Sequence, residues 1–226
     1  MDAADTAIVR RTMLFNRLTD AQFAELVGSS HPHAYPKGCL LFQQGEVVET
    51  IPIVVSGWVR LFRVHVDGVD TTVRIVGPAH GFVEAAVLLG RPTDISAETV
   101  SEARILMVDA DRLRSRLKTD ADVAISALAS ASVHLRNLVA DLEKLKTLSV
   151  PRRIAHFIVD TVGKTEGPAE VRLPYEKSLI AGHIGMTAES FSRGLAKLRA
   201  HGVSTLRDVI RVERMEALLE LLYETD

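Results

Sequence analysis

A segment near the C-terminus, TAESFSRGLAKL at residues 187–198, combines apolar and polar side chains at helical spacing. Phe191, Leu195 and Leu198 recur at i, i+4 and i+7, which predicts a helix with this face in a core. On the other face, arginine offers two parallel donors that match O6 and N7 of guanine, and glutamate accepts from N4 of cytosine. These polar side chains have the chemistry to read base edges in a major groove: Thr187, Glu189, Ser192, Arg193 and Lys197.

The pair Glu189 and Arg193 also has a simpler interpretation. Opposite charges four residues apart form solvated ion pairs on ordinary surface helices, and for the pair alone this is the more frequent case. The surrounding sequence favours a nucleic-acid reader, because residues 178–187 predict a helix and a tight turn and residues 203–212 predict a two-stranded wing. Residues 177–212 also hold six basic and two acidic side chains, within a chain of net charge -2.

The first helix of this pair has its own expected contacts. Ser178 is expected to be its N-cap, and the dipeptide Ala181-Gly182 is expected to let the two helices approach closely. The side chains expected to bury this helix are Leu179, Ala181 and Ile184.

A longer helical pattern precedes this region at residues 121–148. Its a and d heptad positions predict that two copies of the helix pair, although such a stripe also packs on a chain's own core. A second apolar strip is expected to face the β-rich region: Ile125, Val133, Val139 and Ala140. The segment Ser149-Val150-Pro151 then ends this helix and starts the next, because proline fits only a first turn. The predicted dimer seam is Leu128, Ala131, Leu135, Leu138, Leu142 and Leu145.

Residues 33–109 change to short β-rich runs separated by turn signals, which predicts an antiparallel β architecture. Asp67-Gly68 marks a hairpin turn, and before this region Thr19 can cap a helix that begins near Asp20. Cys39 is expected on a strand, as a small core residue. We therefore expect an α+β chain with three parts: a sensory β-roll at 13–115, a dimerisation helix at 116–148 and a DNA-binding domain at 149–226.

Composition narrows the function further. A single cysteine among 226 residues excludes a four-thiolate iron-sulfur cluster held by one chain. The sequence has no run of 18 apolar residues and no signal peptide, so we expect a cytoplasmic protein without a membrane partner. It has no paired carboxylates, metal-ligand spacing or nucleophile motif, so we do not expect an enzyme.

The recognition segment resembles that of CRP/FNR transcription regulators, whose pattern E-x-x-S-R falls on Glu189, Ser192 and Arg193. The resemblance continues through GEVVETIPIVVSGWVRLFRVHVDG, EAAVLLGRP and SAETV, and so covers nearly the whole chain. It implies a winged helix-turn-helix behind a cyclic-nucleotide-binding-like β-roll. It also implies a homodimer that binds palindromic double-stranded DNA with TTGA-type half-sites and meets RNA polymerase, as an activator.

The phosphate cassette of this family matches FVEAAVLLGRPTDISAETV only in part. Glu84, Ser96 and Ala97 agree, but Val83 replaces the family's glycine and Ile95 replaces the arginine that neutralises a cyclic phosphate. Arg91 lies nearby in a loop and is a poor substitute. The departure argues against cyclic AMP as the effector. The alternative is a cyclic-nucleotide-responsive regulator, or a cyclic-nucleotide-binding regulatory module without DNA binding.

A cassette without the arginine resembles the Dnr-like branch of the family, which responds to nitric oxide. That resemblance implies haem b, with His80 or His134 as candidate axial ligands, and His31 and His33 lie in a loop. The expected effector pocket consists of Val83, Glu84, Val87, Leu88, Ile95 and Ser96, of which four are apolar side chains that suit a porphyrin.

Overall fold

The computed structural model describes residues 1–28, 30–172, 176–206 and 209–223. Inside those ranges the description leaves out the side chains of residues 130, 134, 137, 141 and 172. The chain forms two compact units, Met1–Leu138 and Val139–Asp226.

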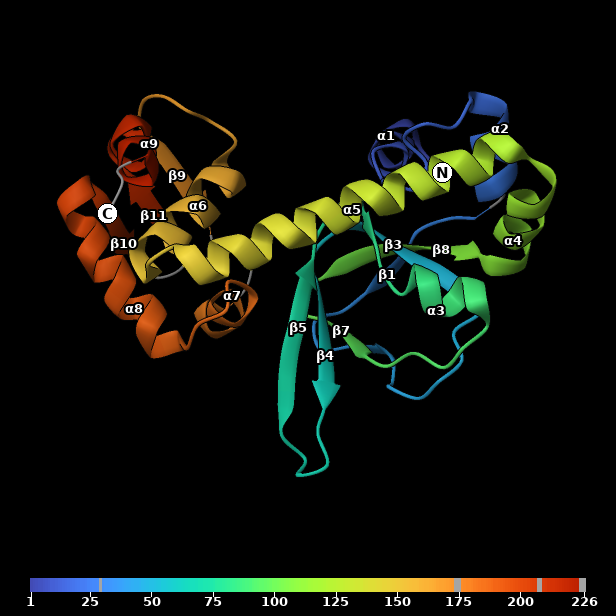
Figure 1. Cartoon of the computed structure of the whole chain (residues 1–226), viewed down its shortest axis with the longest axis horizontal. Helices are drawn as coiled ribbons and strands as arrows, with labels where there is room; N and C mark the ends of the chain where they lie inside the picture. The colour runs from blue at the N-terminus through green and yellow to red at the C-terminus, as the bar shows by residue number, and fades with distance from the viewer. Residues whose placement is uncertain (29, 173–175, 207–208, 224–226) are drawn as a thin grey trace. The chain divides into compact units, whose positions relative to one another are not determined.

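Two four-stranded antiparallel sheets make up the β part of the first unit (Figure 1). One has the order β1-β8-β3-β6 and the other β2-β7-β4-β5, and this confirms the antiparallel architecture predicted for residues 33–109. The strands are β1 (His33–Tyr35), β2 (Leu40–Phe42), β3 (Thr50–Ser56), β4 (Val59–Val64), β5 (Asp70–Val76), β6 (His80–Gly81), β7 (Ser96–Thr99) and β8 (Ala103–Asp109).

The two sheets face each other across an apolar core. In the β2-β7-β4-β5 sheet, Leu61 lies opposite both Ala97 and Arg74, so these three side chains share one face. Leu61 and Ala97 are buried in a cluster that also contains Val54 and Ile105 of the other sheet. This row of β7, β4 and β5 therefore points inward, and the roll is closed by packing between its sheets.

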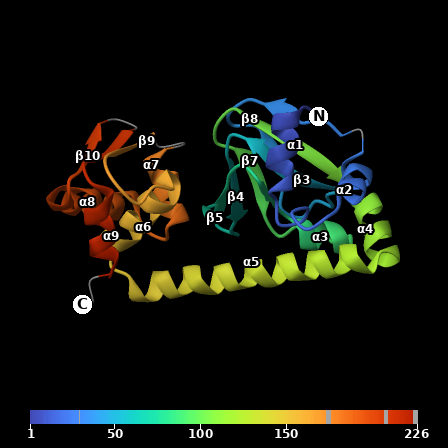
Figure 2. The ribbon, with the colours of Figure 1, turned by 90° about the horizontal axis from the view of Figure 1, so that it is seen from above.

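Short helices cover the other sheet of the roll. Figure 2 shows α1 and α2 beside the sheet of β3 and β8, and a second apolar cluster joins them. Helix α1 was not predicted; its Asp5 is buried and accepts two hydrogen bonds from Arg104, at 2.8 and 2.7 Å. The helices are α1 (Ala3–Arg10), α2 (Asp20–Val27), α3 (Glu84–Leu89) and α4 (Ala110–Thr119).

Local capping and turn predictions hold in this unit, except at the cysteine. The Thr19 hydroxyl accepts from the backbone N–H of Gln22 and forms a capping box that starts α2, as predicted. Strands β4 and β5 form the predicted hairpin, with Gly68 at a φ of +80° in its turn. Cys39 corrects the expectation for that residue: it is only half-buried and precedes β2 instead of lying on it.

Helix α5 (Ala121–Thr147) confirms the predicted long helix, and its apolar stripe is open to solvent in the single chain. Its first turns are anchored through buried Val123. The second strip corrects our expectation, because Ile125, Val139 and Ala140 are exposed and only Val133 is half-buried. The predicted seam is solvent-accessible throughout: Leu128, Ala131, Leu135, Leu138, Leu142 and Leu145.

By length and composition, α5 is also a helix that a membrane could hold. One such helix is weak support for a span, because an exposed apolar stripe is equally what a helix needs to pair with a copy of itself.

The second unit is a small helical domain with a three-stranded sheet of order β10-β11-β9 (Figure 1). Ser149 is the N-cap of α6, and Pro151 lies in the first turn, as predicted. Strands β10 and β11 are the predicted wing, to which the structure adds β9 as a third strand. The elements are α6 (Val150–Val162), β9 (Ala169–Arg172), α7 (Lys177–His183), α8 (Ala188–Lys197), the 3-10 turn η1 (Leu198–His201), β10 (Val203–Leu206), β11 (Val209–Val212) and α9 (Met215–Tyr223).

Candidate nucleic-acid interface and effector site

Helix α8 is fixed on the domain by the face predicted to be apolar. Phe191, Leu195 and Leu198 are all buried. Thr187 caps the helix, and its hydroxyl accepts from the backbone N–H of Ser190 at 3.2 Å. The buried side and the cap together leave the opposite side of α8 directed away from the core.

The polar face of α8 is open to solvent, as its chemistry requires. The side chains of Glu189 and Arg193 are 76% and 67% exposed, and Ser192, Lys197 and Thr187 are exposed as well. Glu189 Oε1 and Arg193 Nη1 form an ion pair at 3.2 Å. An exposed pair of this kind contributes about 0–1 kcal/mol, so little free energy opposes its opening when bases offer better partners. The ion pair therefore orients both side chains but is weak enough to open when DNA binds.

The contacts of the preceding helix differ from the prediction. Helix α7 begins two residues earlier than a Ser178 cap requires, because the extended backbone ends at Glu176, which is its N-cap. Ile180 and Ala181 are the buried residues of α7, whereas Leu179 and Ile184 are half-buried. Ile184 is the C-cap residue and therefore lies at the end of the helix.

Gly182, which was expected to let α7 and α8 approach closely, is exposed. A close approach occurs instead between α8 and α6, at Gly194. A Cβ atom on Gly194 would lie 2.4 Å from Ile154 Cδ1 and 2.8 Å from Val150 Cγ1. Helix α8 therefore rests on α6 through a glycine in its middle, which sequence periodicity alone does not distinguish from an ordinary surface glycine.

The turn between α7 and α8 is held by an arginine that the sequence prediction missed. Arg153 Nη1 donates to the carbonyl oxygens of Ile184 at 3.2 Å and Gly185 at 3.0 Å. These carbonyls end a helix and lack helical partners. Gly185 has a φ of +69°, and a Cβ there would lie 2.6 Å from Leu145 Cδ2, so both backbone and space require glycine.

In the first unit, the cassette opens with a strained residue. Val83 has a φ of +58°, in the left-handed region that β-branched side chains avoid, and this is where the family pattern has glycine. Glycine adopts this backbone conformation without steric cost, whereas Val83 adopts it with strain. Val83 packs against both apolar clusters of the roll.

Glu84 follows at the start of α3 and lies against β6. A Cβ on Gly81 would lie 2.6 Å from Glu84 Oε1, so Gly81 leaves room for the carboxyl group. Burial raises the pKa of Glu84, and this outweighs its own backbone N–H and the positive charges of Arg74 and His80, which lower it.

The other predicted pocket residues are divided between the two apolar clusters. Val87 and Leu88 pack with the helices, whereas Ile95 packs between the sheets. Ser96 is buried, and its hydroxyl accepts from the backbone N–H of Gln44 at 2.9 Å. Among the predicted pocket residues, Val83 packs against both clusters, as does Val48 outside the predicted set.

His80 has the environment of a metal-ligating histidine in one respect. Its Nδ1 lies 3.0 Å from the carbonyl oxygen of Pro78, which can only accept, so the proton belongs on Nδ1 and Nε2 keeps its lone pair. The ring is exposed. The side chain of His134 lies outside the described residues. Among the residues that the structure describes, no three His, Cys, Asp or Glu side chains gather as metal ligands.

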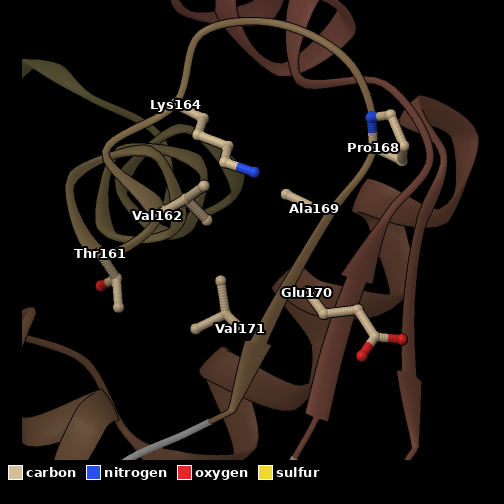
Figure 3. Close-up of a pocket in the computed structure, with 7 residues that line it drawn as sticks. All are labelled: Thr161, Val162, Lys164, Pro168, Ala169, Glu170 and Val171. Atoms are coloured by element: carbon tan, nitrogen blue, oxygen red, sulfur yellow. The ribbon is translucent and has the colours of Figure 1, made fainter.

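A surface hollow of about 330 Å³ lies in the second unit, between the end of α6 and β9 (Figure 3). In Figure 3, Lys164 extends toward the space between Val162 and Ala169. None of the predicted site residues lines this hollow.

Both parts of the chain are similar to known protein domains. A cyclic nucleotide-binding domain model matches residues 32–120, and a Crp-like helix-turn-helix domain model matches residues 152–221. The CRP-like cAMP-activated global transcriptional regulator of Mycobacterium tuberculosis is 28% identical over 86% of this chain and 89% of its own length. The nitrogen fixation regulation protein FixK of Rhizobium meliloti is 29% identical over 83% and 85%.

Solved structures extend the comparison. A candidate cyclic nucleotide binding protein from Ruegeria pomeroyi is 33% identical, covers 98% of both chains and has a TM-score of 0.80. DNR from Pseudomonas aeruginosa is 23% identical, covers 97% of this chain and 98% of its own, and has a TM-score of 0.57, which shows a shared fold.

A β-roll of the nucleotide-binding type together with a winged helix-turn-helix defines a DNA-binding transcription regulator. The chain belongs to the CRP/FNR family.

Proposed function

We propose that this regulator acts as a homodimer on palindromic DNA with TTGA-type half-sites. The observation that carries the proposal is the exposed polar face of α8, which buried Phe191, Leu195 and Leu198 hold outward. Two recognition helices related by a two-fold axis match half-sites about 34 Å apart. The exposed seam of α5 is the surface that such a dimer would bury.

The role of Arg193 is tested by Arg193→Ala. A bidentate contact to guanine is worth about 1–3 kcal/mol, so we expect the dissociation constant to rise at least about tenfold and discrimination at one base pair to fall. Fluorescence anisotropy with a TTGA palindrome and with single-base variants measures both. Lys164→Ala, in the hollow away from α8, is the matched control and should keep wild-type affinity. Unchanged affinity and preference in Arg193→Ala would reject the assignment.

For the effector, we propose haem-based sensing of nitric oxide, as in the Dnr-like branch. His80 supports it, because its Nδ1 contact to Pro78 leaves Nε2 available as an axial ligand, and haem would supply the iron that binds nitric oxide. Such a ligand on β6 lies directly before Val83 and Glu84 of the cassette. The alternative is a cyclic nucleotide effector, which the loss of the cassette arginine at Ile95 argues against.

Haem reconstitution tests this effector. We expect stoichiometric uptake with a Soret band that nitric oxide shifts, and a loss of affinity of at least about tenfold in His80→Ala. His65→Ala, at an exposed histidine of the hairpin, is the control. Absence of uptake by the wild type rejects haem, and micromolar binding of cyclic AMP by calorimetry would favour the alternative.

Three further features follow from the proposed function. We propose that the protein acts in the cytoplasm, binds RNA polymerase as an activator and performs no catalysis. The domain boundaries at residues 115–116 and 148–149 remain a prediction; the structure divides into compact units after Leu138.

A further inference from the structure

Arg74 on β5 is an arginine on the inner face of the roll. It lies opposite Leu61 of β4, which lies opposite Ala97 of β7, and both of these neighbours are buried. Directly opposed residues of antiparallel strands place their side chains on the same face. Arg74 is itself half-buried, so its guanidinium stands beside the apolar interior.

The other arginines of this sheet form ion pairs, whereas Arg74 interacts with the acidic group of Glu84 through space. Arg60, on the opposite face, pairs with Asp70 and with Glu98, the latter at 3.0 Å, and Arg63 pairs with Asp94 at 2.5 Å. For Arg74, no hydrogen bond or ion pair is found within the part of the chain that the structure describes. A half-buried guanidinium whose donors have no hydrogen-bonded acceptor is unfavourable, and an anion bound to those donors would relieve it.

Glu84 is an acidic group near Arg74, and the two interact through space. Glu84 is half-buried at the start of α3, where Gly81 leaves room for its carboxyl group. Among the described residues no hydrogen bond joins Arg74 to Glu84, so the guanidinium donors of Arg74 are available to a bound anion.

Arg74 also lies in register with Ala97 of β7, the strand that carries the cassette. Ala97 follows Ile95 by two residues, and Arg74 lies two strands away from Ala97, at about 10 Å by the ordinary spacing of strands. The positive charge missing at position 95 is thus present on the same face of the same sheet, carried by β5 instead of β7.

We propose that Arg74 anchors the anionic group, a carboxylate or a phosphate, of the effector that occupies the roll. The proposal rests on the proposed control by an effector and names the chemical class that the effector must contain. Two sources share this chemistry: the propionates of haem and the phosphodiester of a cyclic nucleotide.

The test uses the full chain and starts with inorganic phosphate as the probe, at constant ionic strength adjusted with chloride. Trp58 is the only tryptophan and lies against Gly77, three residues from Arg74, so its fluorescence reports on this part of the roll. We expect saturable quenching or enhancement by phosphate in the wild type. In Arg74→Gln the apparent affinity should fall at least about tenfold, because a charge-assisted contact is lost. Arg91→Gln, at an exposed loop arginine, is the matched control and should behave as the wild type.

Haemin and cyclic AMP are then titrated into the same variants. Binding of either that weakens at least about tenfold in Arg74→Gln, and recovers in part in Arg74→Lys, supports the proposal and identifies the carboxylate or the phosphate source. No saturable response to phosphate in the wild type, or equal binding by wild type and Arg74→Gln, overturns it. Circular dichroism of each variant confirms that it is folded. Since the readout is Trp58 in the roll, failure here leaves the result for Arg193 and DNA untouched.

Discussion

Glu84 is a half-buried carboxyl group whose pKa differs between the folded and unfolded chain, so its ionisation is coupled to stability. Because burial raises its pKa, the folded protein binds the proton more tightly than the unfolded chain does. The cost of burying the charged form is absent below the ordinary glutamate pKa, near 4.5, and grows as pH rises through the folded pKa. Glu84 therefore lowers the stability of the protein at neutral pH.

We predict that Glu84→Gln is more stable than the wild type at pH 7, since the amide carries no charge to bury, and that the difference shrinks as pH falls toward 4.5. Urea unfolding at several pH values measures it. Glu46→Gln, at an exposed position, is the control and should give a small, pH-independent difference. A gain in Glu84→Gln that did not change with pH would contradict the linkage.

For single residues, the sequence was enough to predict roles that depend on local spacing. It was not enough to predict roles that depend on contacts with residues far away in the chain. The polar face of α8 followed from spacing of three and four residues. Arg153 and Arg74 did not, because one acts through carbonyls 31 and 32 residues away and the other through its register across three strands. The cassette departure at Val83 was visible, but its left-handed backbone was not.

At the scale of elements, the contact between α6 and α8 sets where the recognition face points. Gly194 is the contact point, with no room for a Cβ beside Ile154 and Val150. Two side chains that meet there would push the helices apart or leave their favoured rotamers.

We predict that Gly194→Ala destabilises the protein by about 1–2 kcal/mol, because overpacking of about 1–3 kcal/mol exceeds a gain in helix propensity of up to about 1 kcal/mol. Ile154→Val removes the Cδ1 atom at 2.4 Å, so the double variant should recover part of the loss. Urea unfolding of the two single variants and the double variant gives the coupling. Strict additivity would show that the two residues do not compete for this space.

Start signals made two helices predictable. Helix α2 follows from its Thr19 cap, and α6 from Ser149 and Pro151. Helix α1 also has a local cap, Asp2, which was not used in the prediction, whereas its ion pair between Asp5 and Arg104, 99 residues away, is not visible in any local pattern. The start of α7 at Glu176 instead of Ser178 shows the usual uncertainty of a boundary with several polar residues.

At the scale of the whole molecule, the apolar seam of α5 has no cover in a single chain. Leu128 and Leu135 are 69% and 62% exposed. Long apolar stripes of this kind are rare on monomers, and in a heptad repeat they are covered by a second helix.

We predict that Leu135→Arg converts the protein to a monomer, because it places a charge in the centre of the seam. Affinity for a palindrome should then fall by at least about a hundredfold, since only one half-site is engaged at a time. Analytical ultracentrifugation and anisotropy measure the two effects. Arg136→Glu, an exposed charge change outside the seam, is the control. A dimer that survived Leu135→Arg would place the interface elsewhere.

The contact between Leu145 and Gly185 gives the seam a second role. Leu145 is the last leucine of the seam, and it also lies against the turn that precedes the recognition helix. If two copies of α5 pair as proposed, the packing of Leu145 in that pair acts directly on the α7–α8 turn. A change in the helix pair would then reach the recognition helix through this one side chain.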